Sequence, residues 1–377
     1  MSLLYIIAGE RSGDAHGAKL MAALRDLSPV VEFAGAGGPL MRAAGGNAVA
    51  DWVEEAGVVG LVEVLRNYGY FKREFDRMLG EITRRRPEAV VLIDYPGFNL
   101  RMARAIKKID PGIRVLYYIS PQVWAWNRSR IPKMARTLDL MLCIFPFEVE
   151  LYRQSGLRAE FVGHPLVDEL GDAAARGGIA REGDLVGLFP GSRMREVGAL
   201  FPIMADAAAL ARLRQPELRF AAAAASDRLR NEMVAILEAS RLPVDACHIS
   251  VGQSRDLMQR AGCGLVASGT ATLEAAFLGL PYALTYKVAY PTYLAARMLM
   301  RVKHLGIVNI LAGREIVREF LQSDANPEKL SDEILRLSAS EPERERLLAD
   351  LRRITGMLGK PGTHARAAAA IAEFLDD

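Results

Sequence analysis

The chain has 377 residues, which is more than one ordinary hydrophobic core holds, so two domains of about 150 to 200 residues are expected. Apolar residues make up 51% and charged residues 25% of the chain, a balance that excludes an intrinsically disordered protein. The formal net charge of +3 lacks the strong basic bias of nucleic-acid binders, so we expect no nucleic-acid partner.

Short apolar runs alternate with helical stretches along the whole chain. Strands are predicted at 3–9, 30–38, 89–94, 114–120, 140–146 and 159–165 in the first half, and at 185–192, 219–226, 246–252, 263–270 and 281–288 in the second. Continuous apolar strands that alternate with helices are typical of parallel sheets covered on both faces. The sequence therefore predicts an α/β protein with two Rossmann-like, doubly wound domains that face a cleft.

A segment rich in glycine, charge and small residues, HPLVDELGDAAARGGIAREGD at 164–184, is typical of a hinge. We place an N-terminal domain at 1–168, a C-terminal domain at 169–345, and helices at 346–377 that pack back on the first domain or on a partner chain. Ligands of open α/β sheets bind beyond the carboxyl ends of the strands, so the cleft between the domains is the expected site.

No targeting or membrane-spanning segment is predicted. The first residues, MSLLYIIAGERSGD, lack a basic start and a cleavage-like end, and we interpret them as a strand. Nowhere do eighteen apolar residues run together, so the cytoplasm is the expected compartment. The three cysteines and the histidines His16 and His164 lack metal-ligand spacing, and we interpret them as structural residues. We expect no metal and no cofactor.

The first predicted strand ends in AGERSGD (8–14), whose glycines permit a tight turn and whose serine and aspartate can cap the next helix. A structural turn and a ligand loop are both open alternatives, but Glu10 has no local structural need and is expected at the cleft. The glycines of GAGGP (35–39) do not form a dinucleotide fingerprint, because the third glycine is missing and Pro39 interrupts the pattern. A nicotinamide cofactor is therefore not expected.

The strand in AVVLIDYPGFN (89–99) runs directly into Asp94, which has no cation beside it in the sequence. A carboxylate is costly to bury unless it is paired, hydrogen-bonded or open to a site. One alternative makes Asp94 an Asx-turn before Pro96. The other makes it a catalytic carboxylate at the cleft.

Two turns in the second half carry groups that bind anions. LFPGSRMREV (188–197) offers backbone N–H groups, a hydroxyl and a guanidinium from Gly191, Ser192 and Arg193. A capped helix with solvated arginines is the alternative.

The second turn, in ASGTATLEAAFLGLP (267–281), predicts a phosphate cradle at a helix N-terminus. Glu274 lies one turn into that helix, where it can accept hydrogen bonds from ribose hydroxyls; the alternative is an interaction with the helix dipole. The cradle is formed by Ser268, Gly269, Thr270 and Ala271.

Two stretches combine aromatic or apolar residues with cations. ISPQVWAWNRSRIPKMAR (119–136) holds Trp124, Trp126 and four cations without an acid, which fits a membrane surface or, as an alternative, a packed loop beside a solvated helix. The run from 57 to 79 is too densely apolar at its start for one helical stripe, so we predict an acyl-chain pocket at a membrane surface. An ordinary buried loop and helix is the alternative.

Together these motifs resemble the lipid-A-disaccharide synthase family, and the likeness covers nearly the whole chain. It runs through AGERSGD, GLVEV (60–64), IDYPGFN, SPQVWAW, VGHP, PGSRMREV, SGTATLE and NILAGRE (309–315). The sequence departs from the family pattern at Val308 and Arg318, where proline is common, and at Asn127, where a basic residue is common.

The resemblance implies a membrane-associated glycosyltransferase of the GT-B fold that joins UDP-2,3-diacylglucosamine to 2,3-diacylglucosamine 1-phosphate (lipid X), with inversion and release of UDP. It implies Asp94 as the general base, with Glu10 as the alternative, and Arg193 as the cation for the leaving pyrophosphate. The inner-membrane surface is the implied partner, and a homodimer stays an open alternative. Another UDP-sugar enzyme of the same fold, an epimerase or a cell-wall glycosyltransferase, is the competing hypothesis.

Site residues are assigned on the same basis. The UDP-sugar is assigned to Gly191, Ser192, Arg193, Ser268, Gly269, Thr270, Ala271, Glu274, Asn309 and Gln322. The acceptor and its lipid chains are assigned to Val62, Leu65, Phe71, Trp124 and Trp126.

Overall fold

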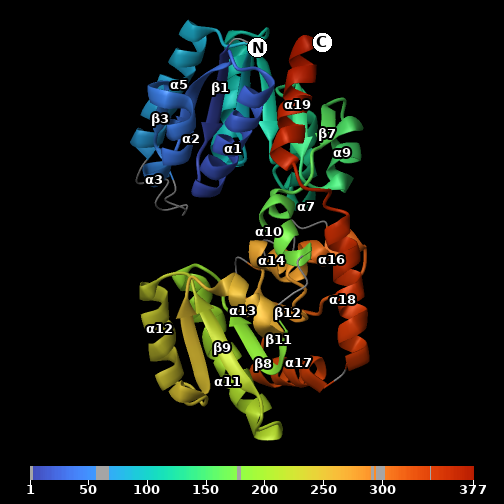
Figure 1. Cartoon of the computed structure of the whole chain (residues 1–377). Coiled ribbons are helices and arrows are strands. Elements are labelled where there is room, and N and C mark those ends of the chain that lie inside the picture. The colour runs from blue at the N-terminus through green and yellow to red at the C-terminus, as the bar shows by residue number, and fades with distance from the viewer. Residues whose placement is uncertain (1–2, 57–67, 176–179, 290–292, 294–301, 340) are drawn as a thin grey trace. The chain divides into compact units, whose positions relative to one another are not determined.

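The computed structural model describes residues 3–56, 68–175, 180–289, 293, 302–339 and 341–377 (Figure 1). The chain divides into two compact units. Unit 1 comprises Met1–Asp168 and Leu358–Asp377, and unit 2 comprises Glu169–Met357. The first division falls within helix α10 (Pro165–Ala175).

Unit 1 is built on a parallel sheet in the order β3-β2-β1-β4-β5-β6-β7. Its strands are β1 (Leu3–Ala8), β2 (Glu32–Gly37), β3 (Val49–Asp51), β4 (Ala89–Ile93), β5 (Arg114–Tyr118), β6 (Leu140–Cys143) and β7 (Arg158–Phe161). Its helices include α1 (Arg11–Leu27), α2 (Pro39–Gly45), α3 (Val53–Ala56), α5 (Tyr68–Arg85), α6 (Pro96–Ile109), α7 (Val123–Trp126), α8 (Ile131–Met134), α9 (Pro146–Arg153) and α19 (Thr363–Asp376).

Both faces of this sheet are buried, which explains why strands β1, β4 and β6 are apolar at every position. Tyr5 and Ile7 of β1 face the core cluster that α5 and α6 complete with Met78 and Met102. On the other face, glycines of α1 permit close contact with the sheet: a Cβ at Gly17 would come within 3.2 Å of the Ile93 side chain. The α/β prediction is confirmed for this unit.

Unit 2 repeats the pattern with a parallel sheet in the order β10-β9-β8-β11-β12-β13. The strands are β8 (Glu182–Phe189), β9 (Arg219–Ala224), β10 (Cys247–Val251), β11 (Ala261–Ala267), β12 (Tyr282–Tyr286) and β13 (Glu319–Leu321). The helices are α11 (Met194–Arg214), α12 (Asp227–Glu238), α13 (Ser254–Arg260), α14 (Thr270–Phe277), α16 (Ile307–Ala312), α17 (Pro327–Ala339) and α18 (Glu341–Gly356).

The C-terminal helices differ from the expected single segment at 346–377. Helix α18 belongs to unit 2, where it contacts α14, α16 and α17 through a face that includes the buried Leu347 and Leu351. Helix α19 belongs to unit 1 and contacts α1 through its buried small residues. The expected segment is therefore shared between the units because its two helices carry separate apolar faces.

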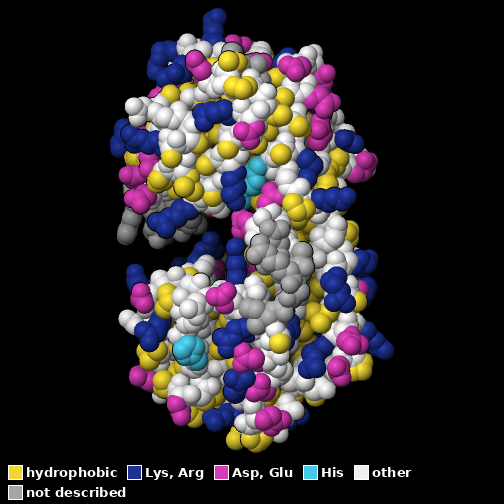
Figure 2. Space-filling model, viewed as in Figure 1, with side chains coloured by type: hydrophobic (Ala, Val, Ile, Leu, Met, Phe, Trp, Pro, Cys, Tyr) yellow, Lys and Arg dark blue, Asp and Glu magenta, His cyan; other side chains and the backbone are white. Residues whose placement is uncertain are grey.

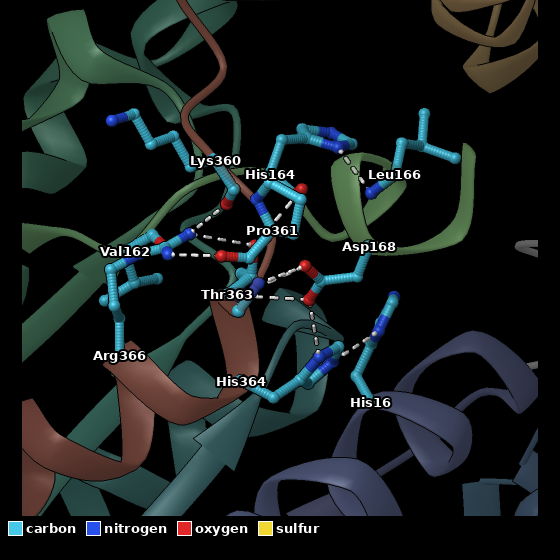
Figure 3. A network of polar contacts seen from close by, with 11 residues as sticks. His16, Val162, His164, Leu166, Asp168, Lys360, Pro361, Thr363, His364 and Arg366 are labelled. Carbon is cyan, nitrogen blue, oxygen red and sulfur yellow. Dashed lines mark hydrogen bonds and ion pairs between the residues drawn. The ribbon is translucent and has the colours of Figure 1, made fainter. Parts of the chain in front are cut away.

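Asp168 fastens the start of α19 to the rest of unit 1 (Figure 3). Its carboxylate accepts hydrogen bonds from the backbone N–H groups of Gly362 (2.6 Å) and Thr363 (3.0 Å), which caps the helix N-terminus. His364 Nδ1 lies 3.2 Å from the same carboxylate, and His16 Nδ1 lies 3.3 Å from His364 Nε2. The two imidazoles thus form part of a structural network between α1 and α19.

The visible surface of the chain carries charges of both signs. Figure 2 shows Lys and Arg side chains intermixed with Asp and Glu over the visible face, which fits the small net charge. No helix within the described part of the chain has the length and apolar character needed to cross a bilayer.

Candidate active site

Two carboxylates meet at the carboxyl edge of the unit 1 sheet. Ala8 of β1 pairs with Ile93 of the neighbouring parallel strand β4, so Glu10 and Asp94 leave the sheet at the same edge. Asp94 is half-buried, and no ion pair joins it to a Lys or Arg in the described ranges. The negative charge of Glu10 is close enough to influence the ionisation of Asp94. The two acids therefore lie at one edge of the unit 1 sheet, and their catalytic role stays a prediction.

The backbone at Asp94 is strained. Asp94 and Tyr95 have φ values of 44° and 50°, in the left-handed region that residues with a Cβ rarely adopt. Tyr95 is the N-cap of α6, and its ring fits only because residue 9 is glycine: a Cβ there would lie 2.3 Å from the Tyr95 ring. The Asx-turn alternative for Asp94 does not apply, since it requires an N–H two residues on and Pro96 has none. Strain of this kind is found preferentially at functional sites.

The environment of Asp94 makes it a weaker acid than usual. Burial and, after it, the negative charge of Glu10 raise the pKa of Asp94, and the backbone N–H of Tyr95 opposes them; the net result is a pKa of about 6. A carboxyl group with a pKa near neutrality is ionised at physiological pH but holds a proton well once it has accepted one. Asp94 is therefore suited to act as a general base.

The neighbouring strand β5 also ends in an unusual turn. Ile119 has a φ of 65°, which is a true outlier for a β-branched residue. The next residue, Ser120, donates a hydrogen bond to Glu148 Oε1 (2.6 Å), and Trp124 Nε1 donates to the same oxygen (2.8 Å). Burial raises the pKa of Glu148 to about 7, and these donors oppose the shift.

This network corrects the expected role of one tryptophan. Trp124 was assigned to the acceptor lipid, but its ring is buried, packs edge-on against Phe147 and is hydrogen-bonded to Glu148. The packed-loop alternative therefore describes Trp124. Trp126 ends helix α7. The signal that was missed is Glu148 itself, which completes a capping box with the Phe145 backbone at the start of α9.

The other residues assigned to lipid binding are only partly covered by the structure. Val62 and Leu65 lie outside the described residues. Phe71 lies on α5, where it is half-buried against the core of unit 1. The described portion of the 57–79 run forms the first part of helix α5, and the acyl-chain pocket stays a prediction.

In unit 2, the PGSR turn follows β8 and presents its groups at the carboxyl edge of the sheet. Gly191 has a φ of 108°, and a Cβ at this position would lie 2.4 Å from the Glu196 carboxylate. Glu196 Oε2 accepts hydrogen bonds from the backbone N–H groups of Ser192 (3.1 Å) and Arg193 (3.3 Å). The N–H groups expected to bind an anion are thus occupied by an internal carboxylate.

Arg193 is the exposed cation of this turn. Its guanidinium pairs with Glu196 at 3.1 Å, yet its side chain remains 70% exposed. A guanidinium in such a weak surface pair is available to a phosphate, which is a stronger partner.

The SGTATLE turn leaves the same edge, because β8 pairs with β11 in parallel and Phe189 lies opposite Val266. Gly269 has a φ of 146°, and Ser268, Gly269 and Thr270 are part-exposed or exposed at the start of α14, with Ala271 next to them. Glu274 binds Arg255 (2.7 Å), which also binds Glu169 (2.8 Å). The carboxylate assigned to ribose is therefore already engaged in an ion pair.

Two further residues assigned to the UDP-sugar hold backbone segments in place. Asn309 is buried; its amide donates to the Val317 carbonyl (2.7 Å) and Glu319 Oε1 (2.8 Å), and its oxygen accepts from the N–H groups of Ile316 and Val317. Gln322 pairs with the N–H and C=O of Val288 at 3.0 and 3.1 Å. Both amides therefore support the site rather than face it.

The two parallel α/β units define a protein of the GT-B fold class. A putative UDP-N-acetylglucosamine 2-epimerase from Listeria monocytogenes has a TM-score of 0.65 and 13% identity, over 99% of this chain and 96% of that one. A calicheamicin glycosyltransferase has a TM-score of 0.54 and 15% identity, over 100% and 98% of the two chains. At these identities the likeness concerns the fold alone, and the predicted GT-B fold is confirmed.

The chain belongs to the lipid-A-disaccharide synthetase family, whose model matches residues 4–371. The lipid-A-disaccharide synthase of Geobacter metallireducens is 41% identical over 98% of this chain and 96% of the relative. That of Geobacter sulfurreducens is 40% identical over 99% and 97% of the two chains. The family predicted from the motifs is confirmed, and the chain is a glycosyltransferase of lipid A biosynthesis.

Proposed function

We propose that the chain joins UDP-2,3-diacylglucosamine to 2,3-diacylglucosamine 1-phosphate, giving lipid A disaccharide 1-phosphate and UDP. Family membership supplies the reaction class. The observation that carries the mechanism is Asp94, an acid without a cationic partner among the described residues, with a pKa raised to about 6 at the end of β4. An inverting transfer needs one base, and unit 1 offers one at the edge where ligands bind.

In this mechanism the 6-hydroxyl of the acceptor attacks the anomeric carbon of the donor in line with the departing UDP. The new C–O bond forms as the bond from the anomeric carbon to the pyrophosphate oxygen breaks, and Asp94 accepts the hydroxyl proton. Burial and, after it, the negative charge of Glu10 keep the pKa of Asp94 high. If Asp94 does not fill this role, Glu10 is the alternative base.

The donor is held by unit 2. Arg193 and the N–H groups of Ser192 and Arg193 bind the pyrophosphate, which displaces the Glu196 carboxylate from them. Ser268, Gly269, Thr270 and Ala271 contribute the N-terminus of α14, and Glu274 contacts the ribose. Asn309 and Gln322 act indirectly, by holding the loops that complete this edge.

The proposed chemistry needs no divalent metal, because the chain has no Asp-x-Asp pair of the kind that joins a metal to a sugar-nucleotide pyrophosphate. Arginine and the helix dipole stabilise the leaving group instead. No cluster of three metal-binding side chains occurs among the residues that the structure describes.

We further propose that the protein works at the cytoplasmic face of the inner membrane. Its substrates are lipids, and Arg128, Lys133 and Arg136 are exposed cations on one short stretch of unit 1. Each such cation contributes about 1 kcal/mol on an anionic bilayer surface. A homodimer remains a prediction.

Product analysis tests the proposed reaction. Purified protein is mixed with UDP-2,3-diacylglucosamine and lipid X, and the products are identified by mass spectrometry. We expect one disaccharide 1-phosphate and one UDP for each donor consumed. An epimerised UDP-sugar formed without acceptor, or transfer only to an acceptor that lacks acyl chains, would contradict the proposal and identify the competing UDP-sugar enzyme.

A further inference from the structure

Two buried side chains converge on the backbone carbonyl of Asp94. Asn99 Nδ2 donates a hydrogen bond to this oxygen at 2.8 Å, and the Tyr117 hydroxyl donates to it at 2.5 Å. Asn99 lies one turn into α6, and Tyr117 lies on the adjacent strand β5. Both residues are fully buried, so neither is available to contact substrate.

The orientation of the Asn99 amide is fixed by its neighbours. Its nitrogen donates to the carbonyls of Ile93 (3.1 Å) and Asp94, so the opposite orientation would place two carbonyl oxygens against the amide oxygen. The amide oxygen is buried and has no hydrogen-bond partner within the described ranges. A buried acceptor without a partner destabilises a fold, and such a feature calls for an explanation.

The tyrosine hydroxyl remains a hydrogen-bond donor at neutral pH. Burial raises the pKa of Tyr117 well above its usual value, and the charge of Asp94 raises it further. The phenol therefore keeps its proton whether Asp94 is ionised or not. Its hydrogen bond, together with that of Asn99, holds the carbonyl of a residue whose φ of 44° is unfavourable for a side chain with a Cβ.

We propose that Asn99 and Tyr117 are positioning residues that hold the Asp94 carbonyl, fix the left-handed turn at Asp94 and Tyr95, and thereby place the Asp94 carboxylate for proton transfer. This inference rests on the proposed role of Asp94 as the base. It explains why the turn persists at this edge: an alternative backbone conformation of Asp94 would leave the two buried donors without their shared acceptor.

The chain provides a matched control for the tyrosine. Tyr118 is the next residue on β5 and is equally buried, but its hydroxyl has no hydrogen-bond partner in the described part of the chain. Tyr117→Phe and Tyr118→Phe each remove one buried oxygen from adjacent positions of the same strand. Only the first removes a hydrogen bond to Asp94.

The experiment measures kcat, KM and thermal unfolding for Tyr117→Phe, Asn99→Ala and Tyr118→Phe, each in the native chain and combined with Asp94→Asn. We expect Tyr117→Phe to lower kcat by about tenfold or more with KM nearly unchanged, because a small misplacement of a catalytic group is costly. Tyr118→Phe should retain native kcat. In the Asp94→Asn background, Tyr117→Phe should cause almost no further loss, since both changes act through one carboxylate.

Three outcomes decide the matter separately. Equal kcat for Tyr117→Phe and Tyr118→Phe would overturn the positioning role, and so would an undiminished effect of Tyr117→Phe in the Asp94→Asn background. Native turnover by Asp94→Asn alone would instead overturn the role of Asp94 as base, and this inference with it. If Asn99→Ala fails to fold, the conservative Tyr117→Phe still decides the question.

Discussion

Charged side chains at the carboxyl edges of the two sheets differ in whether they have a partner of opposite charge. At the end of β4 in unit 1, Asp94 has no cationic partner among the described residues, and its backbone is held in a strained conformation. At the ends of β8 and β11 in unit 2, Arg193 is paired with Glu196 and Glu274 with Arg255. The carboxylate of Asp94 in unit 1 therefore lowers stability, whereas the charges in unit 2 are already paired within the protein in the absence of substrate.

This difference distinguishes residues with a proposed catalytic role from residues that stabilise the fold. An unpaired, partly buried charge destabilises a fold and is retained where a reaction uses it, whereas a paired charge or a fully bonded amide contributes to stability. Substitutions at the first edge should therefore remove activity and spare the fold. Substitutions at the second edge should weaken substrate binding or the fold itself.

The largest effect is expected from Asp94→Asn. Loss of the base should lower kcat by on the order of 10²-fold or more, with UDP affinity near native. Asparagine tolerates the left-handed conformation, so the backbone turn is preserved. A turnover assay and calorimetric titration with UDP measure the two quantities. Near-native turnover in the folded variant would transfer the role of base to Glu10.

Asp94→Asn should lower activity but should not lower stability. Because burial and the charge of Glu10 raise the pKa of folded Asp94 to about 6, ionisation of this carboxyl opposes folding, with a penalty that grows from about pH 4 and is complete above about pH 6. Asp94→Asn should therefore keep or raise Tm at pH 8. The gain should vanish below about pH 4, where the carboxyl is protonated in folded and unfolded chains alike.

Asn309→Ala examines the second edge. The substitution removes four hydrogen bonds from a buried amide and leaves backbone groups unpaired, so we expect a loss of about 3 kcal/mol in the free energy of unfolding. Denaturant unfolding measures it, and Asn231→Ala on the exposed surface of α12 is the control. A stable variant that has lost UDP binding would show instead that Asn309 contacts the donor.

Arg193→Ala should weaken UDP binding by roughly tenfold, the value of one charge-assisted hydrogen bond to phosphate. Stability should change little, because the Arg193 side chain is mostly exposed. Arg195→Ala, an exposed cation on the same turn of α11, is the matched control in the UDP titration. An equal loss in both variants would indicate general attraction between charges rather than a specific contact.

Glu10→Gln is expected to act through Asp94. Removing the negative charge takes away one cause of the raised pKa of Asp94, so the acid limb of the pH–rate profile should move to lower pH by less than one unit. Turnover at pH 8 should fall less than tenfold. A shift to higher pH would contradict the electrostatic coupling between the two acids.

The smallest effect is expected from metal removal. Turnover should be unchanged after exhaustive treatment with EDTA, because arginine and the N-terminus of a helix carry the charge on the leaving group. A loss of activity that magnesium restores would show that unit 2 requires a metal at its edge.

Much of the fold could be predicted from local patterns, and the exceptions have a common cause. Each of the eleven predicted strands overlaps an observed one, because strands buried on both faces are continuously apolar. The missed strands, β3 and β13, have three residues each and lie at sheet edges. Such short segments leave no apolar run to detect.

The site was predictable only in part. A polar residue directly after a buried strand marks the carboxyl edge, and this rule brought Asp94 and Glu10 together. The same rule cannot tell an amide that faces substrate from one that holds a loop, as Asn309 and Gln322 do. A local pattern also does not show that Trp124 is buried and hydrogen-bonded to Glu148, which lies 24 positions away in the sequence.

The return of the chain to unit 1 at Leu358 has a consequence for the order of events during synthesis. Unit 2 is an insertion within unit 1. The hydrogen bonds by which Asp168 caps α19 can form only after residues 362 and 363 have been synthesised. At about 5 to 20 residues per second, the ribosome needs on the order of 10 s to make the inserted unit. During that interval the face of α1 that α19 covers stays open to solvent. Unit 1 is therefore completed last, although its first residues emerge first.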